Sequence, residues 1–153
     1  MNLKNYTSCV PPTRSVAQIE QILVSIGAKH IAKTYDDNFN LAGITFQVVY
    51  DNRPMIFKLP ANFELIEKIM LGEIKRPRRG TIDKTKDQAQ RTAWKLLLDW
   101  VEVQASMILI GRREAMEVFL SYAYDPQRDQ TFFERLQETK FKMLSSGTIN
   151  DER

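Results

Sequence analysis

The residues most able to do chemistry in this chain are the basic ones that gather between positions 73 and 95. This segment carries eight Lys and Arg residues against three acidic ones, a net charge of +5, whereas the whole chain carries only +3. The rest of the protein is therefore slightly acidic. Positive charge concentrated in this way, running from a loop into a helix, indicates a phosphate-bearing partner. Nucleic acid and a small phosphorylated ligand both fit that description.

The basic loop brings three arginines together immediately before a predicted helix. Arg76, Arg78 and Arg79 surround Pro77, and Gly80 follows them. Guanidinium groups bind phosphate through paired hydrogen bonds, and the free N–H groups of a helix N-terminus also favour anions. Loop and helix end together could hold a diphosphate.

Arg91 and Lys95 continue the basic segment along the helix. Each has an acidic residue four positions away, Asp87 for Arg91 and Asp99 for Lys95. Side chains with this spacing meet on a helix surface, so the two predicted ion pairs offer a simpler explanation for these charges. A ligand site and a solvated charged face both stay open on spacing alone.

Other residues that often carry chemistry lack the neighbours they would need. The single histidine, His30, has no Ser, Cys or paired acid at a motif spacing, which favours a structural or surface role. The single cysteine, Cys9, cannot form an internal disulfide and is expected to be a small core residue. Asp36 and Asp37 lack the spacing of a calcium loop and are expected to form a turn. There is no nucleotide-binding fingerprint, so we expect neither enzymatic activity nor a metal or cofactor.

Composition is that of an ordinary soluble globular domain. Hydrophobic residues make up 43% and charged residues 27% of 153 positions, which is enough for one core without disulfides or metals. Apolar runs fall well short of the ~20 residues that a membrane span needs, and the first seven residues are polar. We therefore expect a cytosolic protein without membrane association, with a single α+β domain over 1–144 and a flexible tail over 145–153.

The first half of the chain predicts a helix followed by an antiparallel sheet. A short strand is expected at 4–8, and Ser15 with Gln18 predicts a capping box for a helix that Gly27 ends. The three strands of the sheet are expected at 29–35, 41–50 and 54–59, with turns at 36–40 and 51–53. Apolar residues alternate with polar ones along the middle strand, so one face of the sheet should be buried.

The second half predicts helices throughout. They are expected from Asn62 to Gly72, from about Thr85 to Ile110 after a basic loop over 73–84, from Arg113 to Tyr124 and from Phe132 to Met143. The helix from Thr85 to Ile110 is apolar around most of its circumference, so it must lie in the middle of the protein or at a subunit interface. The fold class expected is a small antiparallel β-sheet packed against a long central helix and shorter helices, assembled as a homo-oligomer.

Several segments together resemble the Thoeris anti-defence family, type one, of phage and prophage proteins. The segments that carry the resemblance are Lys4-Asn5-Tyr6-Thr7, Val10-Pro11, Arg14-Ser15-Val16, Ile19-Glu20, Ile22-Leu23, Gly27-Ala28, Phe57-Lys58-Leu59-Pro60-Ala61-Asn62, Gln88-Ala89, Arg91-Thr92-Ala93-Trp94-Lys95, Asp99-Trp100 and Glu117-Val118-Phe119-Leu120. The resemblance covers about residues 4 to 124, and its motifs are mostly structural ones.

The resemblance implies a viral sponge in the cytoplasm of a bacterial host. Such a protein is oligomeric, has no enzymatic activity, and binds cyclic ADP-ribose isomers made by TIR-domain enzymes, and in some members cyclic oligonucleotides. Binding two phosphates and an adenine requires basic side chains and an aromatic ring. Charge and placement give the candidate ligand-binding residues as Phe57, Lys58, Arg76, Arg78, Arg79, Arg91 and Lys95. The alternative function is that of a phage protein binding single-stranded nucleic acid, and a structural adaptor without a ligand comes third.

Overall fold

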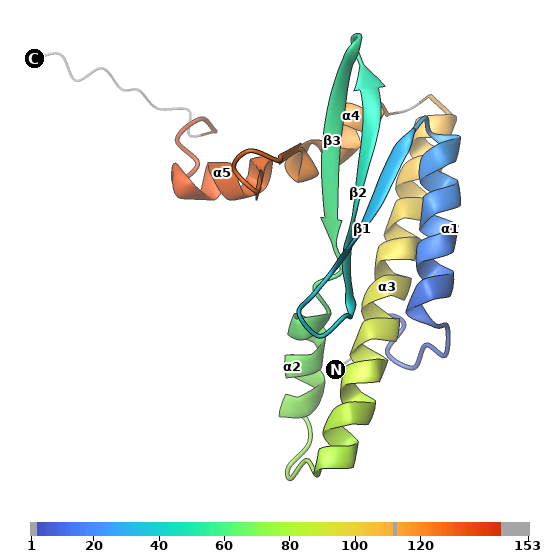
Figure 1. The fold of residues 1–153 in the computed structure, drawn as a ribbon, viewed down its shortest axis with the longest axis vertical. Coiled ribbons are helices and arrows are strands. Elements are labelled where there is room, and N and C mark those ends of the chain that lie inside the picture. Colours follow the sequence, from blue (N-terminus) through green and yellow to red (C-terminus); the bar gives the residue numbers. More distant parts are fainter. Residues whose placement is uncertain (1–2, 112, 145–153) are drawn as a thin grey trace, which may run out of the picture.

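The fold is α+β, as predicted. A computed structural model describes residues 3–111 and 113–144, and the tail predicted over 145–153 lies outside the described residues. Within them a three-stranded antiparallel sheet lies beside a long helix, α3 (Arg79–Leu109), which runs nearly the full height of the molecule (Figure 1). At about 1.5 Å per residue its 31 residues span ~46 Å.

The sheet is a meander in the order β1 (His30–Tyr35), β2 (Leu41–Tyr50) and β3 (Arg53–Pro60). Tyr50 pairs directly with Arg53, so only Asp51 and Asn52 form the second turn. Both have positive φ angles, 49° and 58°, which is the backbone that a two-residue hairpin favours and that Asn and Asp tolerate. The three predicted strands are confirmed, with the third beginning one residue earlier.

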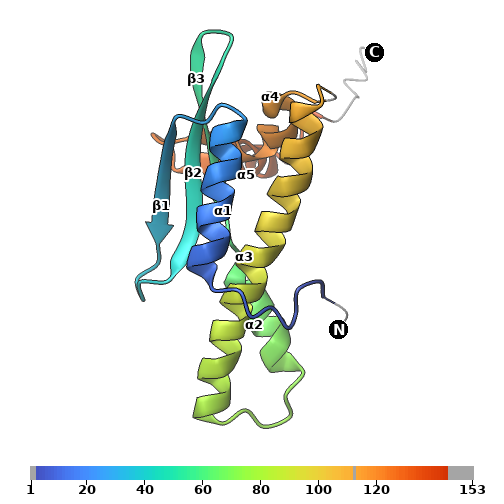
Figure 2. The same cartoon turned by 90° about the vertical axis from the view of Figure 1, so that its right-hand side faces the viewer.

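One face of the sheet is buried beneath α1 (Pro12–Ser25) and α3 (Figure 2). Ile44 and Phe46 of β2 are fully buried, while Thr45 and Gln47 are only half-buried, so the predicted alternation is confirmed in this part of the strand; Tyr50 at its end is exposed. Phe46 stacks on Phe57 of β3 with ring centroids 5.3 Å apart. The core therefore forms between the sheet and these two helices.

The N-terminal residues differ from the prediction. Residues 4–7 form turns instead of a strand. Helix α1 begins three residues before the predicted cap, with Pro12 as its first residue, because proline has no N–H to satisfy and its φ angle is already helical. The capping box at Ser15 and Gln18 is therefore wrong, and Ser15 is buried inside the helix. Cys9 is exposed and does not belong to the core.

A helical hairpin extends beyond the end of the sheet. It consists of α2 (Phe63–Gly72), as predicted, and the first half of α3 (Figures 1 and 2). Helix α3 starts at Arg79, six residues before the prediction, so the basic loop covers only 73–78. The N–H groups of Thr81 and Ile82 both reach the Arg78 carbonyl at 2.9 Å, which closes this first turn.

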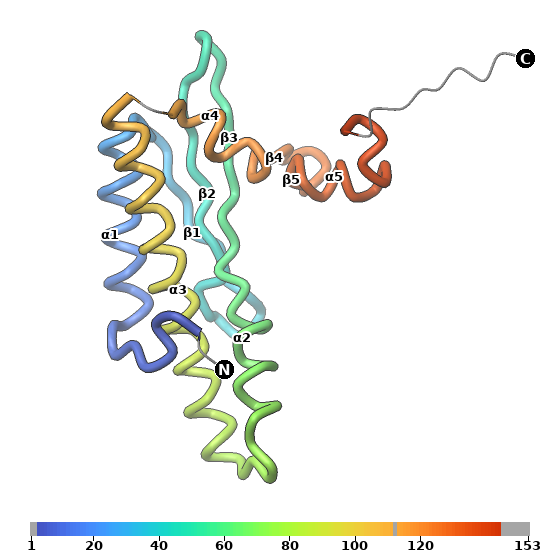
Figure 3. Tube along the Cα trace, turned by 180° about the vertical axis from the view of Figure 1, so that it is seen from behind, coloured from blue at the N-terminus to red at the C-terminus, as the bar shows by residue number. Residues whose placement is uncertain are grey.

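The C-terminal residues form an arm that projects from the body on the side away from α1 (Figure 3). The single helix predicted over 113–124 is wrong. Ala123 forms an antiparallel β-bridge with Phe57, so the chain adopts an extended conformation there, along the edge of β3. The arm is made of α4 (Ala115–Phe119), the 3-10 turn η1 (Leu120–Tyr122), β4 (Tyr124–Asp125), β5 (Gln130–Thr131) and α5 (Phe132–Glu138). Helix α5 begins where predicted, under a capping box of Thr131 and Glu134, but ends earlier.

Most of the apolar surface of α3 is covered within the chain. Trp94, Leu98 and Val101 are fully buried beneath the sheet and α1, and Trp94 Nε1 donates to the Leu41 carbonyl at 3.1 Å. Helix α2 covers part of the first half. The prediction of a central position is thus confirmed, while Val103 at 60% exposure and Leu109 at 62% stay uncovered. No helix in the described part of the chain is long and apolar enough to cross a membrane.

Candidate functional site

Five basic side chains gather at the free end of the α2–α3 hairpin. We call this group the cationic tip; it consists of Lys75, Arg76, Arg78, Arg79 and Lys84, and all five residues are exposed. None has an ion-pair partner among residues 3–111 and 113–144. Arg78 is the N-cap of α3 and makes no side-chain cap bond there, so the first N–H groups of the longest helix face the same region.

The electrostatics of the tip favour an anion. The tip brings five positive charges close to the positive end of the α3 dipole, and Glu73 and Asp83 add two exposed negative charges nearby. A single exposed cation binds phosphate weakly in water, but several cations together raise the local concentration of phosphate. The tip can therefore attract a phosphate group, although no wall encloses it.

Arg91 and Lys95 lie away from the tip. They follow Arg79 by 12 and 16 residues, which places them ~18 and ~24 Å further along the helix axis. Lys95 Nζ contacts Asp99 Oδ1 at 2.6 Å, so this predicted pair is confirmed. Arg91 instead donates from Nη2 to Gln88 Oε1 at 2.7 Å. Of the two ion pairs that the spacing predicted, the pair of Lys95 with Asp99 is formed, whereas the pair of Arg91 with Asp87 is wrong because Arg91 binds Gln88.

Their partners hold the N-terminal segment, residues 3–10, which we call the strap. It crosses α3 where the hairpin begins (Figure 2). Gln88 Nε2 donates to the carbonyls of Tyr6 at 2.9 Å and Ser8 at 3.1 Å, and Thr92 Oγ1 donates to the Asn5 carbonyl at 3.1 Å. Because Arg91 occupies the Gln88 carbonyl oxygen, the amide N–H groups of Gln88 are directed to the strap.

Asp99 is the charged anchor of the strap. Its Oδ2 accepts from Asn5 Nδ2 at 3.0 Å and contacts Lys4 Nζ at 2.8 Å, while Lys95 holds Oδ1. Desolvation acts to raise the pKa of this carboxyl group. The hydrogen bonds from Asn5, Lys4 and Lys95 outweigh it and hold the pKa well below its ordinary value. The carboxylate is therefore charged at neutral pH, and this charge holds Lys4 and Asn5 of the strap.

A hollow of about 330 Å³ lies between the strap and the hairpin. Its lining combines the strap, α2 with the loop that follows it, and α3: Tyr6, Thr7, Met70, Ile74, Thr81, Lys84, Thr85 and Gln88. Lys84 belongs both to this lining and to the cationic tip, so the hollow adjoins the tip. We call it the strap hollow. Sequence patterns gave no sign of it, because its walls come from three segments that are distant in the sequence.

Phe57 and Lys58 lie apart from the tip, on β3. Phe57 is 1% exposed and packs between Phe46 and Phe119, so its ring is not accessible to a ligand in this arrangement. Lys58 Nζ contacts Asp129 Oδ1 at 3.2 Å and lies 4.8 Å from the ring centroid of Tyr124. The pKa of Asp129 is lowered, chiefly by the hydrogen bond that Tyr124 donates to its carboxylate and next by Lys58. Lys58 thereby holds the arm against the sheet.

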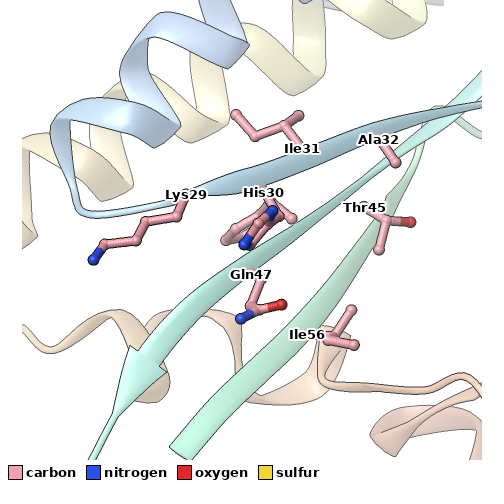
Figure 4. A pocket seen from close by; sticks show the side chains of 8 residues that line it. Lys29, His30, Ile31, Ala32, Thr45, Gln47 and Ile56 are labelled. Carbon is pink, nitrogen blue, oxygen red and sulfur yellow. The ribbon is translucent and has the colours of Figure 1, made fainter. Parts of the chain in front are cut away.

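A second hollow, of about 370 Å³, lies on the open face of the sheet (Figure 4). His30 and Gln47 face each other across β1 and β2, with Thr45 and Ile56 beside them, while Lys29 extends away. No acid lines it. Among the described residues, no group of three or more His, Cys, Asp or Glu side chains is arranged to hold a metal ion.

The seven candidate residues therefore do not form one site within a single chain. Arg76, Arg78 and Arg79 share the tip, while Arg91 and Lys95 support the strap and Lys58 supports the arm. Sequence reasoning missed Tyr6, Thr81, Lys84 and Gln88 as a group. A partial signal existed, because Gln88, Thr92, Lys95 and Asp99 follow one another at helical spacing and present polar groups on one face.

Comparison of the chain with protein-family models, with curated proteins and with solved structures finds no match. The resemblance to the Thoeris anti-defence family thus depends on the short segments that carry it. The geometry of the site is an independent line of argument.

Proposed function

We propose that this protein binds and sequesters a cyclic ADP-ribose-type nucleotide signal in the cytoplasm of a phage-infected bacterium, without chemical conversion. The observation that carries the proposal is the cationic tip beside the strap hollow. Lys84 of the tip lines a concave surface of the size that small ligands use, and neither Lys84 nor the three arginines of the tip are paired among the described residues. A ligand made of a diphosphate and a base needs both a group of cations and a concave surface.

The proposal includes a homo-oligomer. The tip is open to solvent in the single chain, and tight retention of a small ligand requires removing it from water. A second subunit against the hairpin would supply the missing wall. Exposed apolar residues, including Leu65 and Ile69 on α2, are available for that contact.

The test is native mass spectrometry of the protein purified from cells that express a TIR-domain defence enzyme. We expect an oligomer that carries a bound nucleotide with the mass of a cyclic ADP-ribose isomer. A ligand-free protein from these cells, together with no calorimetric binding of added isomers, would contradict the proposal.

A second candidate, binding of single-stranded nucleic acid, is favoured by one observation. The tip projects at the end of a hairpin, where a polymer could pass without entering a pocket (Figure 1). Polymer binding releases counterions, so its affinity should fall with salt with a log–log slope of about −0.7 per phosphate contact. Binding of a single diphosphate ligand should respond weakly. An oligonucleotide slope of several units, without retention of cyclic ADP-ribose isomers, would make nucleic acid the better assignment.

A further inference from the structure

The strap hollow differs from the tip in combining an apolar floor with unpaired polar groups. Met70 is 3% exposed and Ile74 is half-buried, and they form the floor between the two helices of the hairpin. Tyr6 supplies the hollow's aromatic ring and is 39% exposed. An apolar floor with an aromatic side chain beside it can accept a planar ring, because stacking on an aromatic side chain is available to every base.

The polar groups around the hollow are arranged for an anion at the end nearest the tip. Lys84 has no ion-pair partner, and the hydroxyl groups of Tyr6 and Thr81 make no side-chain hydrogen bond, within the described residues. Gln88 and Thr85 are already engaged, with the strap and with the Thr81 carbonyl. Thr81, Lys84 and Gln88 follow one another on one face of α3, whereas helical periodicity turns Arg79 to the opposite side.

We infer that the strap hollow holds the base of a nucleotide ligand against Tyr6 and Met70, with the adjoining phosphate on Lys84. This inference rests on the proposed function and specifies where the ligand lies. Arg76 and Arg78, which precede α3, are then the arginines of the tip that face the second phosphate. The strap is part of the site, since Tyr6 and Thr7 form one of its walls and Gln88, Thr92 and Asp99 hold that wall in place.

Hydrogen exchange with a cyclic ADP-ribose isomer as the probe tests this placement on the unmodified protein. We expect the ligand to slow exchange at the amides of residues 5–8, in the strap, as well as at the start of α3. Protection confined to the tip and the start of α3 would overturn the inference while leaving the proposed function intact.

Calorimetry with the same probe tests the individual residues. Lys84→Ala removes a charge-assisted hydrogen bond and should weaken binding about 10- to 150-fold. Tyr6→Ala removes the ring and should weaken it about 5- to 150-fold, while Tyr6→Phe keeps stacking and most of the affinity. Thr81→Trp should block the hollow without a change of charge.

Lys68→Ala is the matched control. Lys68 is an exposed cation on α2, and its position two residues before Met70 places it on the far side of that helix. The Lys68→Ala variant loses the same charge as Lys84→Ala and should bind the isomer with the affinity of the unmodified protein. Wild-type affinity in both Lys84→Ala and Thr81→Trp would overturn the inference but not the proposed function. An unmodified protein that binds no isomer would overturn both.

Discussion

Asp99 is the residue at which the charges of the strap and of α3 meet. Three hydrogen-bond donors from Asn5, Lys4 and Lys95 surround its carboxylate, which is mostly removed from solvent. A structural role of this kind is easily mistaken for a ligand site in the sequence, because Lys95 looks like an available cation. In the fold its charge is already matched.

Asp99→Asn should lower the free energy of unfolding at neutral pH by about 1 to 3 kcal/mol, since charge-assisted hydrogen bonds are lost. The folded pKa of Asp99 is lowered, so its contribution is present above the unfolded pKa near 4 and is lost as pH falls through the folded value. Urea unfolding should therefore show a constant difference from pH 7 to about 5 that shrinks in stronger acid. Asp87→Asn, an exposed acid on the same helix, is the control and should change little.

The arginines of the tip give a second prediction at this scale. Arg76→Ala or Arg78→Ala should weaken nucleotide binding about 10- to 150-fold, because each loses a charge-assisted hydrogen bond to phosphate. Stability should hardly change, since both side chains are exposed and unpaired among the described residues. Calorimetry and thermal melting separate the two effects. Unchanged affinity in both variants would move the site away from the tip.

At the scale of elements, the strap is a segment without regular structure that side chains of α3 hold in place. Thr92 is fully buried and donates to the Asn5 carbonyl, while Gln88 donates to the carbonyls of Tyr6 and Ser8. Buried backbone groups need such partners wherever no helix or strand supplies them. The polar face of α3 therefore supplies hydrogen bonds that a neighbouring strand would supply if residues 4–8 formed the predicted strand.

Thr92→Val keeps the shape of the side chain but leaves the Asn5 carbonyl without this donor. We expect a loss of about 1 to 3 kcal/mol in unfolding free energy and faster hydrogen exchange in the strap. Thr13→Val, on the exposed surface of α1, is the matched control and should leave both unchanged. Equal exchange rates in the strap of Thr92→Val and of the unmodified protein would show that other contacts hold it.

At the scale of the whole molecule, the hairpin, the sheet body and the arm extend in different directions (Figures 1 and 3). Extended parts leave apolar side chains uncovered: Val103 is 60% exposed on α3 and Leu65 is 62% exposed on α2. Covering such residues between subunits is the usual reason for symmetric assembly.

Analytical ultracentrifugation at micromolar concentration should therefore find an oligomer. The variants Val103→Glu and Leu65→Glu place a charge at uncovered apolar positions. At least one of them should shift the oligomer toward the monomer, because an interface core excludes unpaired charge. Arg14→Glu, at an exposed and already charged position of α1, is the control. A strictly monomeric unmodified protein would remove the homo-oligomer from the proposal.

Local patterns in the sequence determined the meander and most helix positions. Alternation along β2, the Asp51-Asn52 turn and Gly27 with its φ of 99° act within a few residues, so they can be read without the fold. Only the tertiary structure decided which residues make up the candidate site. It buried Phe57, engaged Arg91 and Lys95 with the strap, and placed Tyr6 beside Lys84, 78 positions away in the chain. Contacts between distant segments depend on packing, which residue spacing does not encode.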